Sequence, residues 1–194
     1  GRPTLYNAAR RAGYTVGILG KTHYVPPLDE FDGVSVYRPS EPDGRTPNRT
    51  ADATLEGLLV QSFRGFLAYA GLARPNRPWF VHLSFVNPHP PALCANLPIG
   101  YAPVSAARLA AQPITLSDAE LDAWRRSCKS ACNSSWSRDQ YVQKFTRDRQ
   151  CYYATVEYVD AMVGRALALV NLTTTLVLFT ADHGSQLGGH GHAQ

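Results

Sequence analysis

The sequence lacks any apolar run of the ~20 residues that a membrane-spanning helix requires. Only 18% of its 194 residues are charged, and the net charge of +4 comes from scattered basic residues. A surface that binds a phosphate backbone needs clustered lysine and arginine, which this sequence does not have. We therefore expect one folded unit with no nucleic-acid partner and no membrane segment in this chain.

Cysteine is also scarce, and no C-x-x-C pair is present to suggest a zinc site. The spacing leaves disulfides and free thiols open for the four cysteines, which are Cys94, Cys128, Cys132 and Cys151. Three N-glycosylation sequons begin at Asn48, Asn133 and Asn171. Sequons together with several cysteines favour a secretory route, with a lysosomal or extracellular destination. No signal peptide is visible, and the start at Gly1 and the stop at Gln194 lead us to expect a fragment.

Helical and strand patterns alternate along the chain, which predicts an α/β fold with a mostly parallel sheet covered by helices on both faces. A helix at 50–71, capped by Thr50 or Asp52, has an apolar stripe that includes Leu58, Leu59 and Phe63. Residues 25–49 read as a loop, and 92–138 as an irregular insertion that contains a short helix at 117–127 capped by Ser117. The other expected elements are helices at 3–12 and 139–170 and strands at 14–20, 79–86 and 173–180.

Titratable residues follow all three predicted strands. Lys21 and His23 come after the first strand, His89 after the second, and Asp182 with His183 after the third. Ligands of parallel sheets bind at the carboxyl ends of the strands, so we expect these side chains to converge. A lysine and imidazoles suit a tetrahedral anion, and the Asp-His pair suits a cation that polarises it.

Several of these residues have plainer interpretations. The Asp182-His183-Gly184 sequence also fits an aspartate-capped turn, and His82 inside the second strand is assigned to packing. His190 and His192 are alternative zinc ligands beside His183, because imidazole is a common zinc ligand.

The same segments resemble the sulfatase family of the alkaline-phosphatase-like superfamily. "TLYNAARRAGYTVGILGKTHY" is similar to the sulfatase helix followed by AGY-T and GK-x-H, and "WFVHLSFVNPHPP" to the strand that ends in PH-x-P. "YYATVEYVDAMVGRALALV" and "LVLFTADHGSQLGGHG" resemble the helix and the DHG element that follow. The chain is identified as part of a sulfatase N-terminal catalytic domain over 1–194, with the resemblance weakest at 92–138.

The resemblance implies a role for each site residue. Lys21 would bind the sulfate and steady the nucleophile, His23 would contact the nucleophile, and His89 would bind the sulfate near the leaving group. Asp182 and His183 would contribute to a divalent metal site, usually calcium, although a hard cation prefers oxygen ligands.

The family's nucleophile is a formylglycine made from a C/S-x-P-x-R motif, which this chain lacks. The Asp pair that completes the metal site and the lysine expected after DHG are also missing, so we expect the fragment alone to be inactive. The expected function is sulfuric ester hydrolysis, with a sulfated small molecule or glycan as substrate. A phosphomonoester or phosphonate hydrolase of the same superfamily, or a non-catalytic relative that binds sulfated glycans, stays open.

Overall fold

The structure of this chain is a computed structural model. The described residues are 4–22, 31–37, 54–89, 97–98, 101, 117–127 and 135–184. The elements within them are helices α1 (Leu5–Arg11), α2 (Leu55–Ala73), α4 (Asp118–Ser127) and α5 (Arg138–Leu167) and strands β1 (Thr15–Lys21), β2 (Gly33–Tyr37) and β3 (Trp79–Ser84).

The three strands form one parallel sheet in the order β2-β1-β3. In its register, Gly17 lies opposite Gly33 of β2, and Gly20 lies opposite Ser84 of β3. Because all three strands run the same way, their carboxyl ends meet at one edge. The structure confirms the predicted α/β class with a parallel sheet.

One face of the sheet is covered by α1. Val16 and Ile18 of β1 are fully buried and pack with Phe31, and Tyr6 and Ala9 of α1 lie against this cluster. Side chains alternate between the two faces of a strand, so these two residues share a face.

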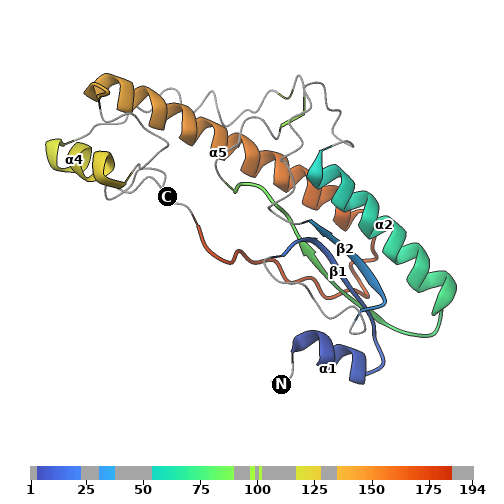
Figure 1. The fold of residues 1–194 in the computed structure, drawn as a ribbon. Coiled ribbons are helices and arrows are strands. Elements are labelled where there is room, and N and C mark those ends of the chain that lie inside the picture. Colours follow the sequence, from blue (N-terminus) through green and yellow to red (C-terminus); the bar gives the residue numbers. More distant parts are fainter. Residues whose placement is uncertain are drawn as a thin grey trace.

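The opposite face is covered by α2 and α5, which lie side by side across the sheet from α1 (Figure 1). Leu19 points into this layer, where it joins Phe63 and Phe66 of α2 with Tyr158 and Met162 of α5. Burying a side chain such as Phe63 contributes about 1.5–3 kcal/mol to the stability of the fold. This cluster holds more buried residues than the one beneath α1, so it is the larger of these two cores. Helices on both faces of the sheet confirm that part of the predicted architecture.

Two glycines of β1 allow close packing. A Cβ at Gly17 would lie 2.7 Å from the ring of Phe66, which fixes how near α2 approaches the sheet. Gly20 has φ +100°, a conformation that residues with a side chain rarely adopt, and a Cβ there would overlap the Ser84 carbonyl group. The backbone turn at Gly20 directly precedes Lys21.

The N-terminus of α2 differs in detail from the prediction. Thr54, not Thr50 or Asp52, caps the helix by accepting a hydrogen bond from the Gly57 backbone N–H at 3.0 Å. Thr54 Oγ1 also lies 2.6 Å from the hydroxyl oxygen of Tyr158 in α5, and both residues are buried. This contact joins α2 to α5. Leu59 and Phe63 of the predicted apolar stripe are buried as expected, whereas Leu58 is 48% exposed and Val60 is buried instead.

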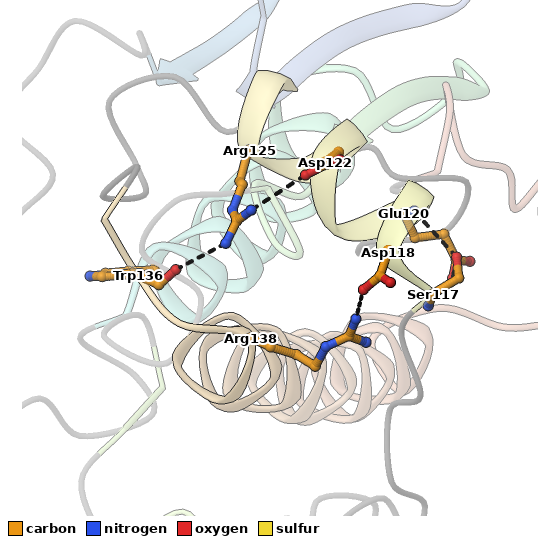
Figure 2. Close-up of polar contacts among 7 residues, drawn as sticks. All are labelled: Ser117, Asp118, Glu120, Asp122, Arg125, Trp136 and Arg138. Carbon is orange, nitrogen blue, oxygen red and sulfur yellow. Dashed lines mark hydrogen bonds and ion pairs between the residues drawn. The ribbon is translucent and has the colours of Figure 1, made fainter.

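Helix α4 packs beside the N-terminus of α5 through charged contacts (Figure 2). Arg138 of α5 pairs with Asp118 of α4, and Arg125 of α4 donates to the Trp136 carbonyl at 3.5 Å. The predicted cap at Ser117 is confirmed, because its hydroxyl accepts from the Glu120 backbone N–H. Most of the predicted insertion at 92–138 lies outside the described residues, so its boundaries stay a prediction.

The predicted loop at 25–49 is wrong in part, because β2 lies within it. The segment Val34-Ser35-Val36 alternates apolar and polar residues as strands do, but the surrounding proline, glycine and aspartate residues obscured this signal. A strand with few residues gains stability chiefly by pairing with β1, which no local pattern reveals.

The predicted third strand at 173–180 is also wrong in this structure. Residues 175–182 form no helix or strand, and Leu176, Leu178 and Phe179 are 80–86% exposed. Apolar composition alone does not make a strand, because its backbone groups must pair with a neighbour. Within the described ranges, β1, β2 and β3 pair with one another and with no further strand.

Cys151 is disulfide-bonded, to a partner outside the described residues. The structure therefore resolves the open choice between thiol and disulfide for this cysteine. Within the described part of the chain, no helix is both long and apolar enough to cross a membrane.

Candidate functional site

Lys21 is the last residue of β1 and lies at the carboxyl edge of the sheet. Its side chain is half-buried, and desolvation lowers the pKa of its ammonium group, which the negative charge of Asp182 opposes. The charge of Asp182 thus acts on this ammonium group from a segment that is distant in the sequence. Asp182 does not follow a strand in this structure, so the convergence of strand-end residues stays a prediction.

His89 follows β3 at the same edge. Gly20 of β1 lies opposite Ser84 of β3. Lys21 follows this pair directly in one strand, and His89 comes after it in the neighbouring segment, so both lie where the two parallel strands leave the sheet. The His89 side chain is exposed, and its backbone N–H donates to the Val86 carbonyl at 3.1 Å, which closes a tight turn.

This turn is tied to the start of α2. The backbone N–H of Asn87 donates to Oε1 of Glu56 at 3.1 Å, and both residues are buried. Burial is the main reason that the pKa of Glu56 is raised, and hydrogen bonds from Asn87 and from the Val86 backbone oppose this shift. Sequence reasoning missed Glu56, although a carboxylate beside an apolar helical stripe was a visible signal.

Asp182 and His183 form a local pair. The His183 backbone N–H donates to Asp182 Oδ1 at 2.9 Å, and His183 Nε2 lies 3.6 Å from Asp182 Oδ2. The pKa of Asp182 is lowered chiefly by the first of these contacts, then by the charges of His183 and Lys21. The carboxylate is therefore ionised near neutral pH.

The donors at Asp182 and His183 fit part of a divalent metal site. Asp182 offers an exposed, ionised oxygen ligand, and the His183 ring faces it through Nε2 while Nδ1 lies 3.0 Å from the Gly184 carbonyl. A calcium ion takes six to eight oxygen ligands, so further ligands are needed. Among the residues that the structure describes, no group of three or more metal-ligating side chains is found.

The remaining candidates divide into two groups. His23, His190 and His192 lie outside the described residues, so their predicted roles are not tested. His82 contacts α1, with its Nδ1 atom 2.6 Å from the Tyr6 hydroxyl and its ring stacked on Tyr6, as the packing assignment expected. Desolvation lowers the pKa of His82.

The fold and this arrangement are those of a parallel α/β protein whose polar site lies where the strands end. Comparison with known proteins gives a more specific answer. The Sulfatase family model matches residues 1–194, the whole chain. The chain therefore belongs to the sulfatase family, as the sequence motifs predicted.

Individual relatives agree with this assignment. A choline-sulfatase of Rhizobium meliloti (strain 1021) is 27% identical over an alignment that covers 97% of this chain and 43% of the relative. An iduronate 2-sulfatase of Mus musculus is 30% identical over 77% of this chain and 28% of the relative. A multifunctional alkaline phosphatase superfamily protein, PehA of Trinickia caryophylli, is 26% identical over 60% of this chain and 25% of the relative. The chain thus spans less than half the length of these relatives.

Proposed function

We propose that the protein containing this chain hydrolyses a sulfate ester. The observation that carries the proposal is that Lys21 ends β1 and His89 follows the neighbouring parallel strand β3, so both lie at the carboxyl edge of the sheet. Two relatives with similar sequences are named for sulfatase activity, a choline-sulfatase and an iduronate 2-sulfatase. Residues 1–194 then form part of the catalytic domain.

The side chains divide the chemistry between them. The ammonium group of Lys21 binds the sulfuryl oxygens and offsets the charge that develops on them, a type of interaction that strengthens in the transition state. The His89 imidazole binds the ester near the leaving oxygen and passes a proton to it, while His23 serves the nucleophile. The nucleophile itself is a formylglycine hydrate, which these 194 residues do not encode.

Asp182 and His183 would hold a divalent cation, for which we propose calcium. When bound, the cation polarises the sulfate and neutralises its negative charge. The ionised, exposed carboxylate of Asp182 supports this role, and the effect of the Lys21 charge on the pKa of Asp182 is consistent with a cation and an ammonium group that share one anion.

A substrate panel tests the function. The whole protein is assayed with the sulfate, phosphate and phosphonate monoesters of 4-nitrophenol and for binding of a sulfated oligosaccharide. We expect the highest kcat/KM for the sulfate ester, and mass spectrometry should detect formylglycine in the active protein. Faster phosphate or phosphonate cleavage, or glycan binding with no turnover, would replace the proposal with one of those functions.

We also propose that the protein is a glycoprotein of the secretory route, lysosomal or extracellular. The Cys151 disulfide supports this, because such bonds persist in oxidising compartments. Asn171 is exposed, and its Oδ1 atom accepts hydrogen bonds from the backbone N–H and hydroxyl of Thr173 in its sequon. Treatment with an N-glycosidase should lower the mass of the secreted protein, and an unchanged mass would argue against glycosylation.

A further inference from the structure

A carboxylate is buried where α2 meets the end of β3, outside the residues assigned a catalytic role. Glu56 lies in the first turn of α2 and is 1% exposed. Its Oε1 atom accepts the Asn87 N–H, whereas among the described residues Oε2 has no hydrogen-bond partner. Carboxylates are rarely buried with one oxygen unsatisfied, because desolvation is costly.

The contact joins two segments that are 31 positions apart in the sequence. Asn87 is 5% exposed and stands two residues before His89, in the turn that the His89 N–H closes on Val86. The Asn87 N–H is buried, so it needs an acceptor, and Glu56 is the acceptor that it has. The bond therefore anchors the backbone at the start of the turn that leads to His89.

The helix turn that carries Glu56 is itself held in place. Thr54 caps α2 two residues earlier, and its contact with the buried Tyr158 fixes the start of α2 against α5. Buried contacts thus join Thr54 to Tyr158 and, two residues further along the same helix, Glu56 to the turn before His89.

We propose that Glu56 is a positioning residue that holds the Asn87–His89 turn and thereby sets the His89 imidazole at the sulfate ester. This inference rests on the proposed function. Glu56 touches neither substrate nor reacting atoms and acts through His89 alone.

Three variants of the whole protein separate this role from simple stabilisation. Glu56→Gln keeps an oxygen that accepts the Asn87 N–H, whereas Glu56→Ala removes the acceptor. Val60→Ala is the matched control, since Val60 lies one helical turn further along α2, is 4% exposed, and is not a partner in the Asn87 bond. All kinetics are measured at a temperature at which every variant is folded.

A small displacement of a catalytic group has large kinetic effects, so we expect Glu56→Ala to lower kcat about 10- to 100-fold and Glu56→Gln to lower it less than about threefold. Val60→Ala should leave kcat unchanged. In a His89→Ala background, Glu56→Ala should have no further effect, because the two residues act as one unit. A full additional loss in that background, or wild-type kcat for Glu56→Ala, would overturn the proposal.

If the wild-type protein cleaves no sulfate ester, the proposed function fails, and the positioning contact is tested by hydrogen exchange. Glu56→Ala should then speed amide exchange in the 85–89 segment, while Glu56→Gln and Val60→Ala should not. Unchanged exchange in Glu56→Ala would show that Glu56 does not hold the turn.

Discussion

Replacing Gly20 by alanine should destabilise the protein more than any other exposed or half-buried glycine substitution in the described region. The backbone at Gly20 has φ +100°, where a side chain costs about 1–2 kcal/mol. A Cβ would also lie 2.9 Å from the Ser84 carbonyl carbon and closer still to its oxygen, so β1 and β3 must separate. Overpacking of this kind costs a further ~1–3 kcal/mol.

Gly13 provides the matched control. It has φ +88°, but a Cβ there would meet nothing within 4 Å. Gly13→Ala therefore carries only the backbone cost of about 1–2 kcal/mol, and Gly20→Ala the sum of about 2–5 kcal/mol. The difference between the two measures the collision with Ser84.

Urea unfolding of the whole protein measures both variants, and their midpoints give the difference in stability. Because Lys21 follows Gly20 directly, turnover by folded Gly20→Ala protein should also fall, whereas Gly13→Ala should keep wild-type turnover. Equal destabilisation by the two substitutions would refute the close approach of β1 to Ser84.

Three further predictions each concern a single residue. Asp182→Asn removes the ionised carboxylate and should weaken calcium binding in calorimetric titration, and unchanged affinity would contradict a metal role. Gly71→Ala should raise stability by about 0.5–1 kcal/mol, because Gly71 lies inside α2 with open space around it, and a lowered unfolding midpoint would contradict this. The raised pKa of Glu56 makes the native state retain a proton that the unfolded chain releases, so stability should fall as pH rises from 4.5 through that raised pKa. Glu56→Gln should remove this fall, and an unchanged pH dependence of its unfolding midpoint would argue against a raised pKa.

The sequence predicted the elements whose patterns are local. The apolar run of β1 and the amphipathic pattern of α5 lie within single segments, and the α/β class follows from their alternation. Lys21 and His89 were found because residues that directly follow parallel strands share one edge. Lys21 and His89 do follow neighbouring parallel strands, whereas residues 175–182 form no strand before Asp182 and His23 stays a prediction.

The rest depends on contacts between distant segments. β2 was hidden among loop-forming residues because its strand forms by pairing with β1. Residues 173–180 look like a strand, but their apolar side chains are exposed and their backbone has no sheet neighbour in the described region. The bond from Asn87 to Glu56 could not be predicted, because a helical glutamate is usually solvated and nothing local links it to a turn after β3.

Whether Lys21 at this sheet edge binds the sulfate is best tested by sulfate release from an aryl sulfate, measured for the whole protein and for two lysine variants. Lys144 pairs with Asp148 on α5, away from the sheet edge, so Lys144→Ala is the control for Lys21→Ala. We expect sulfate release by the wild type and by Lys144→Ala, and a loss of about 10²-fold or more in Lys21→Ala with unchanged folding. Near-normal turnover by Lys21→Ala would contradict the assignment of this edge as the sulfate site.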